Sequence, residues 1–184
     1  HIVIAWMGWV NLANQVKIKT STSKDGGKTW SSTYEIPHTV SRYSSADPCL
    51  AFNASGHVYL SFIDFTGTAP PVTGGVYLCT STDGGLSWNS PTEVISTNYD
   101  GDKWPIDRPW MVIDKSGTET DGTIYITTFN LNRTNPSYRP YLSVSKDNGN
   151  TFSTTYVDGT NWLAGSLNPL PVCSPAVASN GDFY

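Results

Sequence analysis

The stretch from Thr97 to Trp110 is the part of the chain richest in side chains of the types that bind ligands or take part in catalysis. An arginine can hold a carboxylate through two parallel hydrogen bonds, and a tryptophan face can cover a sugar ring. The stretch is therefore a candidate site for an anionic ligand, although Trp104 would serve equally well as an apolar cap. Its charged residues and tryptophans are Asp100, Asp102, Lys103, Trp104, Asp107, Arg108 and Trp110.

Two further kinds of site are compatible with the charges in and near this stretch. Asp100 and Asp102 supply oxygen ligands that suit Ca²⁺, although two carboxylates in a loop are weak evidence for a metal. The remaining arginines are candidates for binding an anionic ligand, with solvated loop charges as the alternative: Arg42, Arg133 and Arg139. No spacing typical of a metal centre occurs, and no Ser-His-Asp grouping is apparent.

Three copies of one short pattern organise the elements that must position these residues. They read Ser23-Lys-Asp-Gly-Gly-Lys-Thr-Trp30, Ser81-Thr-Asp-Gly-Gly-Leu-Ser-Trp88 and Ser145-Lys-Asp-Asn-Gly-Asn-Thr-Phe152, about 60 residues apart. This composition favours a tight turn, because Gly adopts positive φ and the Asp carboxylate accepts amides of its own turn. Residues at repeated positions usually solve a repeated folding problem. We therefore interpret three carboxylates as structural: Asp25, Asp83 and Asp147.

Short β-type runs flank each turn, and no segment has sustained helical periodicity. The pattern predicts an all-β fold of four-stranded antiparallel units within a single segment, 1–184. The predicted boundaries are a partial unit over 1–37, complete units over 47–96 and 107–158, and the start of another over 174–184. The first unit lacks its first strand, and 174–184 supplies a first strand and the beginning of a second.

The predicted connections place one set of loops at the end of the molecule opposite the repeated turns. Loops on a rigid scaffold are the natural place for a site. The residue that enters the first strand is Asp47 in one unit, Arg108 in the next and Ser174 in the last. A position that changes chemistry on a repeated scaffold indicates function, although an ordinary loop salt bridge explains it equally well. The loops are 7–15, 37–47, 63–75, 97–108, 129–139 and 159–174.

The repeated pattern resembles the Asp box, or BNR repeat, of sialidases and related β-propellers, and the resemblance covers essentially the whole chain. It implies a sialidase-like propeller of four-stranded blades, about three of them in this chain and about six in the complete ring. Since three blades do not close a ring, we expect either a fragment of a longer protein or two copies that associate into one ring. In the second case, strand 174–181 of one copy completes the first blade of the other.

The resemblance also implies a set of site residues. Sialidases use three arginines on the substrate carboxylate, an Asp acid/base, and a Tyr nucleophile activated by a Glu. By this comparison Arg108 contacts the substrate, and Asp64 or Asp47 is the acid/base. However, the chain has no Arg-Ile-Pro motif, and Phe65-Thr66 follows Asp64 where the family has Asp-x-Arg. The glutamates fall away from the site loops, so a Tyr–Glu pair is not encoded: Glu35, Glu93 and Glu119.

Composition narrows the choice of partners. A net charge of −4 with 11 basic residues gives no electrostatic basis for nucleic-acid binding. No apolar run approaches the roughly 18 residues that span a bilayer. Two hypotheses remain, both with a carbohydrate ligand and neither with a required cofactor. One is a secreted propeller that hydrolyses an anionic sugar. The other is a non-catalytic propeller that binds glycan or protein through 97–110 and 129–139.

Overall fold

The computed structural model describes residues 1–9, 15–67, 69–132, 139–157 and 174–184. In these ranges the chain forms strands, turns and bends, and no helix occurs. Accordingly, none of the described residues belongs to a helix able to cross a membrane.

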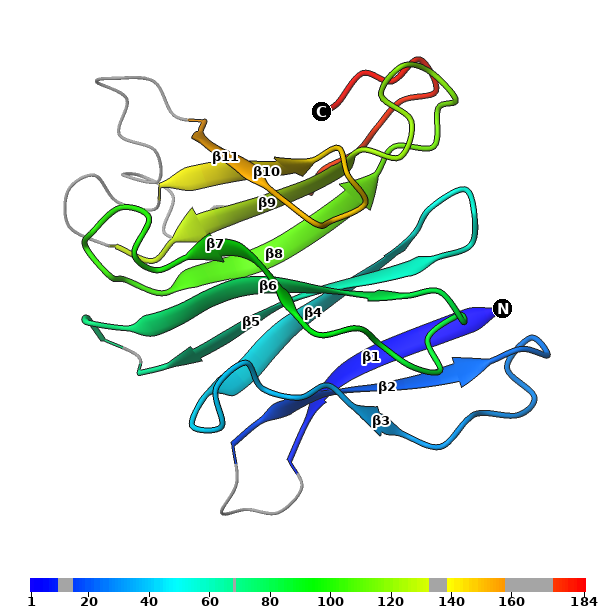
Figure 1. Ribbon diagram of the computed structural model, residues 1–184, viewed down its shortest axis with the longest axis horizontal. Coiled ribbons are helices and arrows are strands. Elements are labelled where there is room, and N and C mark those ends of the chain that lie inside the picture. The colour runs from blue at the N-terminus through cyan, green and yellow to red at the C-terminus, as the bar shows by residue number, and fades with distance from the viewer. Residues whose placement is uncertain (10–14, 68, 133–138, 158–173) are drawn as a thin grey trace.

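Eleven strands form three antiparallel sheets, each built from strands that are consecutive in the chain. Figure 1 shows the sheets in chain order, from the blue first sheet to the yellow and orange third sheet. The first sheet contains β1 (Ile2–Gly8), β2 (Lys17–Ser23) and β3 (Tyr34–Glu35). The second contains β4 (Ser44–Phe52), β5 (Val58–Thr66), β6 (Thr73–Ser81) and β7 (Thr92–Ser96). The third contains β8 (Ile106–Ile113), β9 (Ile124–Asn130), β10 (Pro140–Ser145) and β11 (Ser153–Tyr156).

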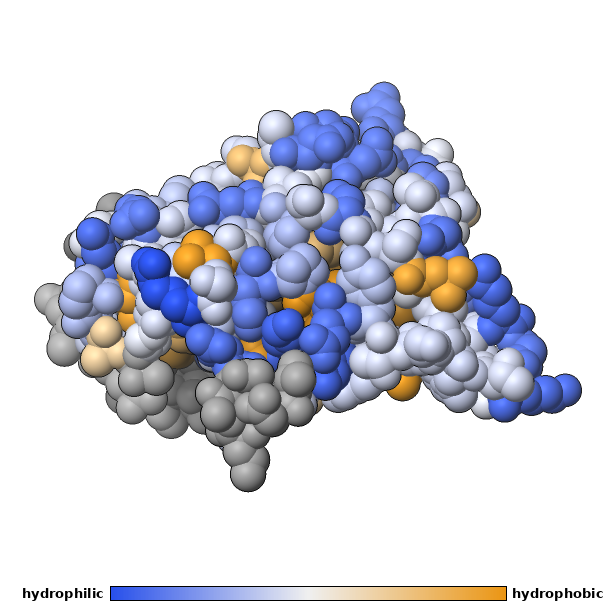
Figure 2. Space-filling view, turned by 60° about the horizontal axis from the view of Figure 1, so that its bottom comes forward, coloured by the Kyte–Doolittle hydropathy of each residue, from blue (hydrophilic) through white to orange (hydrophobic). Residues whose placement is uncertain are grey.

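The second sheet is the centre of the core, because side chains on both of its faces are buried. Alternate residues of a strand point to opposite faces. On β5, Leu60 and Phe62 pack with Ile18 of the first sheet, whereas Tyr59 and Ile63 pack in the cluster that reaches the third sheet. Complete burial of an aliphatic or aromatic side chain contributes about 1.5–3 kcal/mol. By contrast, Figure 2 shows an outer surface that is mainly hydrophilic, with small separate hydrophobic patches.

Each repeated turn (23–30, 81–88 and 145–152) is closed by the same hydrogen bonds to its aspartate. In the first turn, the Ser23 hydroxyl donates to Asp25 Oδ1 at 2.9 Å, and the Thr29 hydroxyl donates to Asp25 Oδ2 at 2.6 Å. The Gly27 amide donates to Ser23 Oγ at 2.7 Å. The other two turns repeat this pattern. The carboxylate thus serves its own turn.

The second and third turns also connect successive sheets. A Cβ at Gly85 would lie 2.8 Å from Thr22 Oγ1, and one at Gly149 would lie 2.4 Å from Leu78 Cδ2. Both glycines have positive φ, so the position requires glycine for its backbone as well as for space. In the second turn, Trp88 Nε1 donates to Thr20 Oγ1 of the first sheet at 3.1 Å. The turns therefore hold neighbouring sheets together.

Strands β4 and β8 carry the same irregularity near their beginning. The register of β4 against β5 shifts between Ala46 and Cys49, and that of β8 against β9 shifts between Asp107 and Trp110. In each bulge a residue that precedes proline has a left-handed backbone, with φ of 52° at Asp47 and 53° at Arg108. Such a conformation costs a non-glycine residue about 1–2 kcal/mol. Both strained residues are ones that the sequence marks as candidate site residues.

The predicted loop boundaries are wrong at this end of the second and third sheets. The pattern predicts loops over 37–47, 63–75 and 97–108, but β4 begins at Ser44, β5 continues to Thr66, and β8 begins at Ile106. The candidate residues of these segments therefore lie on strands: Asp47, Asp64, Asp107 and Arg108. Polar side chains end an apolar pattern in the sequence, but they do not prevent the backbone from continuing its hydrogen-bonded ladder.

The last residues form a short hairpin. The amide of Ala176 donates to the Tyr184 carbonyl at 3.0 Å, and the reverse bond is 2.9 Å long. Phe183 stacks on Tyr125 of the third sheet, with ring centroids 4.6 Å apart. The C-terminal segment is thereby attached to β9.

Candidate functional site

The two bulges bring together one residue of β4 and two of β8. The carboxyl groups of Asp47 and Asp107 lie close enough to interact, and the backbone amide of Arg108 donates to Asp107 Oδ1 at 2.9 Å. We call Asp47, Asp107 and Arg108 the carboxyl-pair site. The bulges are the reason for this arrangement, because the inserted residue changes the direction in which the neighbouring side chains point.

The carboxyl-pair site holds a proton more firmly than a free carboxyl group would. The pKa of Asp107 is raised from 3.8 to about 6. Burial is the largest cause, followed by the hydrogen bond to Asp47 and the negative charge of Asp47, while the Arg108 amide and guanidinium oppose them. Two interacting carboxyl groups share their proton as a pair. The site can therefore donate a proton near neutral pH.

Arg108 supplies the positive charge of this site. Its guanidinium carbon lies 5.8 Å from the centroid of the Phe129 ring, a cation–π contact that fixes the side chain on the third sheet. Within the described residues, Arg108 takes part in none of the salt bridges. The N–H groups of its guanidinium are therefore available to donate two parallel hydrogen bonds to a carboxylate.

Asp64 lies on β5 opposite Ser45 of β4 and is completely buried. Its Oδ1 accepts hydrogen bonds from His38 Nδ1 and from the Ser45 hydroxyl, both at 2.9 Å. Its Oδ2 accepts from the amide and the hydroxyl of Thr39, both at 2.8 Å. A carboxylate that is fully buried and bonded to four donors has no surface left for a ligand. Asp64 can therefore act on a ligand only through His38.

His38 is a functional candidate that the sequence pattern does not reveal. Ser45, His38 and Asp64, which no sequence motif connects, form one buried cluster. Recognising it requires the Ser45–Asp64 strand register, which the sequence alone does not supply. The cluster is not a nucleophilic triad. Ser45 Oγ lies 3.0 Å from Nδ1, the same nitrogen that faces Asp64, so Nε2 cannot take the serine proton.

The outer edge of His38 borders a polar pocket. The side chain is only 6% exposed, and Nε2 has no hydrogen-bond partner among the described residues. The ring lines a cavity of about 400 Å³ together with Gln15, Lys17 and Ser41. Asp64 accepts the Nδ1 proton, and Nε2 is itself buried beneath the wall of this cavity.

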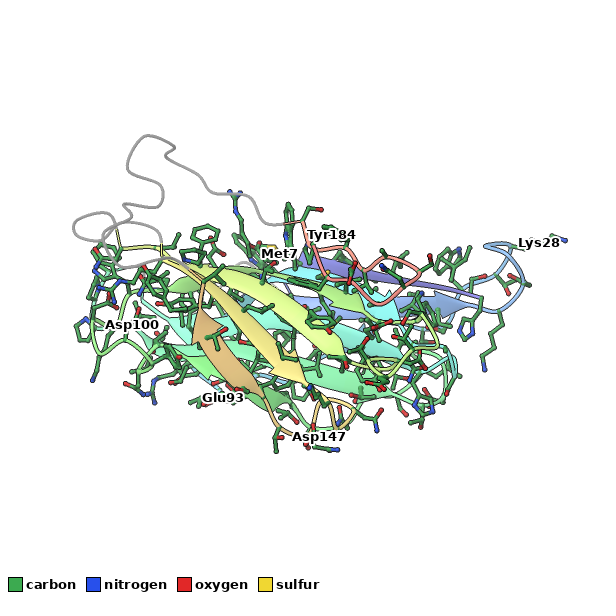
Figure 3. All side chains as sticks on the ribbon, turned by 90° about the horizontal axis from the view of Figure 1, so that it is seen from above. Met7, Lys28, Glu93, Asp100, Asp147 and Tyr184 are labelled. Atoms are coloured by element: carbon green, nitrogen blue, oxygen red, sulfur yellow. The ribbon has the colours of Figure 1, made fainter. Side chains whose placement is uncertain are left out.

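Asp100 anchors its loop to the third sheet. It forms a 3.1 Å salt bridge with Arg139 and accepts a hydrogen bond from the hydroxyl of Tyr141. Burial and the bond to Asp100 raise the pKa of Tyr141, which is 1% exposed, so this phenol stays protonated. Figure 3 shows Asp100 at the end of the molecule opposite Lys28, a residue of the first repeated turn. A buried, protonated tyrosine does not act as a nucleophile.

Asp102 is bonded to donors from its own loop and from β9. It accepts the Trp104 amide at 3.1 Å and the side-chain amides of Asn130 and Asn132 at 3.0 and 3.1 Å. No group of three His, Cys, Asp or Glu side chains in the described ranges could hold a metal. The Ca²⁺ site at Asp100 and Asp102 stays a prediction. In this structure protein donors contact both oxygens of Asp102 and Oδ2 of Asp100.

The remaining predicted residues are not brought to the carboxyl-pair site by any interaction in the described part of the chain. Trp104 is half-buried, and the Arg42 guanidinium lies 5.6 Å from the centroid of its neighbour Tyr43. Arg139 is held by Asp100 and lies 6.0 Å from the Tyr156 ring centroid. Arg133 lies outside the described residues. Asp25, Asp83 and Asp147 are engaged in their own turns.

Comparison with known proteins gives a likeness of fold. No family model and no curated protein matches the chain. A protein of unknown function from Dyadobacter fermentans is 27% identical, with a TM-score of 0.54, over 76% of this chain and 43% of that one. Hadza microbial sialidase Hz136 is 17% identical, with a TM-score of 0.56, over 79% of this chain and 32% of that one. A thermostable family-43 glycoside hydrolase is 13% identical, with a TM-score of 0.57, over 97% of this chain and 58% of that one.

These similarities define a class of fold and leave the activity open. The chain is an all-β protein of antiparallel sheets similar to those of propeller glycosidases. At 13–17% identity, the likeness to the two hydrolases concerns the fold alone, because one fold carries many functions. The chain spans only 32–58% of the length of these three proteins.

Proposed function

We propose that this chain is part of a sialidase-like β-propeller of about six four-stranded blades that hydrolyses the glycosidic bond of an anionic sugar. The observation that carries the proposal is the carboxyl-pair site, where a shared proton and an arginine meet on two strained bulges. Strain at matching positions of a repeated scaffold persists only where the surroundings enforce it, and it is concentrated at functional sites.

Each member of the site has a role in this reaction. Arg108 holds the carboxylate of the sugar through its guanidinium. Asp107 donates its proton to the glycosidic oxygen as the bond to the leaving group breaks, and a pKa of about 6 keeps that proton available in mildly acid solution. The negative charge of Asp47 keeps Asp107 protonated until the transfer, and the amide and guanidinium of Arg108 stabilise the charge left on Asp107.

The pair supplies only one of the two groups that glycoside hydrolysis needs. Retaining enzymes separate their two carboxyl groups by about 5–5.5 Å and inverting enzymes by about 6.5–9.5 Å. Hydrogen-bonded carboxyl groups are closer than either distance, so Asp47 and Asp107 stand on the same side of the sugar. We propose that the opposing nucleophile or base comes from blades beyond this chain.

Asp64 enters the proposal as a positioning residue. It fixes the tautomer and the orientation of His38, whose ring lines the adjoining pocket. Trp104, Arg42, Arg133 and Arg139 are proposed as outer contacts of the same substrate, and Ca²⁺ at Asp100 and Asp102 as an accessory ion that orders the loop.

A non-catalytic glycan- or protein-binding propeller is the second candidate. It is favoured by the saturation of Asp64 and Asp102 with protein donors, which leaves these two carboxylates without catalytic freedom. It is also favoured by the position of Glu93 on the outer strand β7, far from the carboxyl-pair site.

Turnover of a fluorogenic sialoside and of a fluorogenic glucuronide tests the two candidates. The enzyme proposal expects release of the fluorophore, a fall of at least 100-fold in Arg108→Ala, and little change in Lys28→Ala, which alters a cation of the first repeated turn at the other end of the molecule. Binding of the sugars without turnover at any pH between about 4 and 8 would support the binding protein instead.

The proposed ring needs blades beyond those of this chain. They come either from a longer protein, which we propose to be secreted, or from a second copy that pairs with β1. The mass of the 184-residue chain in solution, measured by light scattering, distinguishes these alternatives. A mass of two chains that persists on dilution supports the second copy, and a mass of one chain excludes it.

A further inference from the structure

A polar cleft lies at the repeated-turn end of the second and third sheets, away from the carboxyl-pair site. It has a volume of about 700 Å³, within the usual range for small-ligand sites. β4 runs from the bulge at Asp47 to the hairpin at 53–57, so the cleft and the bulge occupy opposite ends of the same strand. We define this turn cleft by Asn53, His57, Trp88, Asn89, Asn148 and Asn150.

The third repeated turn differs from the other two where it meets the cleft. Asn148 stands where the first two turns have Gly26 and Gly84, and it has a φ of 59°. A Cβ at Gly84 would collide with the His1 ring at 1.9 Å, whereas one at Gly26 meets nothing within 4 Å. Folding therefore does not require a side chain here. Asn tolerates the left-handed backbone better than other non-glycine residues, and its amide is directed to the cleft.

The cleft presents hydrogen-bonding groups whose donor or acceptor character is set by the backbone. Asn89 Oδ1 accepts the Thr80 amide, so the Asn89 NH₂ group is left as a donor. Asn150 Nδ2 donates to the Asp147 carbonyl, so Asn150 Oδ1 is left as an acceptor. The Asn148 amide forms no hydrogen bond with any described residue, and it offers both kinds of group.

The chemistry of the lining selects the class of ligand. No Asp, Glu, Lys or Arg lines the cleft, so neither an anion nor a cation finds a counter-charge there. Vicinal hydroxyl groups each donate and accept, and amide donor–acceptor pairs match them. Trp88, which is 8% exposed, adds a small apolar surface for the C–H face of a pyranose.

We propose that the turn cleft is a second binding site, specific for a neutral sugar. This second site is independent of the carboxyl-pair site, for which an anionic sugar is proposed. The proposal does not rest on the activity proposed above, because a non-catalytic propeller could carry the same cleft.

Side-chain amide NMR tests this assignment. Methyl glucoside, methyl galactoside and methyl mannoside are titrated to about 50 mM, which detects dissociation constants in the millimolar range. We expect at least one of the three to shift the amide signals of Asn89, Asn148 and Asn150. Asn148→Gly restores the residue of the other turns and is expected to keep the fold while weakening binding at least tenfold.

Two control variants complete the test. Gly26→Asn places the same side chain in the first turn, away from the cleft, and should leave binding unchanged. Arg108→Ala should also leave it unchanged, which separates this site from the proposed activity. If none of the three glycosides shifts these amides, or if Asn148→Gly binds as tightly as the natural chain, the cleft is not a sugar site.

Discussion

Replacing Asp107 with asparagine is expected to stabilise the protein at neutral pH. The pKa of Asp107 is about 6 in the folded protein, against 3.8 for an unperturbed aspartate, with burial as the first cause and Asp47 as the second. Because the folded-state pKa is raised, the folded protein binds more protons than the unfolded chain between about pH 4 and pH 6. The free energy of unfolding therefore falls as the pH rises through this window. Asparagine has no proton to lose and can still donate to Asp47.

The magnitude follows from the size of the shift. A difference of about 2 pKa units corresponds to about 3 kcal/mol, since one unit is worth 1.36 kcal/mol. Asp107 is only partly buried, and solvent screening reduces this value. We expect Asp107→Asn to raise the free energy of unfolding by about 1–2 kcal/mol at about pH 7.5 and to leave it nearly unchanged at about pH 4. The stability of the variant should then vary less with pH than that of the natural chain.

Urea unfolding followed by tryptophan fluorescence at about pH 4, 6 and 7.5 measures this difference. Asp121→Asn, in the exposed 114–123 turn, is the matched control and should retain the pH dependence of the natural chain. An Asp107→Asn variant with the same pH dependence as the natural chain would refute the shared proton. A variant less stable at every pH would show that Asp107 contributes a hydrogen bond that asparagine cannot replace.

Two other predictions concern the repeated turns. Trp88→Ala should lower the free energy of unfolding by about 3–5 kcal/mol, because Trp88 is 8% exposed and bonded to Thr20. Trp30→Ala should lower it by less than half as much in the same urea assay, because Trp30 is 43% exposed; equal losses would contradict the linking role of Trp88. Stability should also fall from about pH 4 to pH 2. The pKa of Asp147, like that of Asp25, is lowered from 3.8 to about 2, chiefly by hydrogen bonds from a threonine hydroxyl and amide. The folded state therefore binds fewer protons than the unfolded chain between about pH 4 and pH 2. Asp147→Asn should reduce this acid loss, and an unchanged acid transition would contradict the prediction.

The elements of the fold were predictable because their signals are local. Alternating apolar residues and turn residues such as Asp83 and Gly84 indicate strands and their connections over a few neighbours. The same locality explains the errors at strand ends. The apolar pattern stops before Asp64 and begins after Arg108, whereas β5 continues through Asp64, which pairs with Ser45, and β8 begins before Arg108.

The candidate site was predictable only in its parts. Asp47 and Arg108 stand out in the sequence because they occupy equivalent positions before a proline. Their contact with Asp107 depends on two bulges, each of which inserts residues into one strand without a sequence signal of its own. Likewise, the cluster around Asp64 joins His38 to a strand 26 residues away in the chain.

The strands, the repeated turns and the reactive side-chain types can be read from the sequence, because each depends on neighbours within one turn or one strand. Which of those side chains meet depends on the tertiary structure. The pairing of Asp47 with Asp107 and the burial of Asp64 behind His38 depend on register and on the packing of one sheet against the next. The same is true of the cleft at Asn148, which forms only when two turns from different sheets are placed side by side. Register and packing are set by the whole core, so no short stretch of residues encodes them.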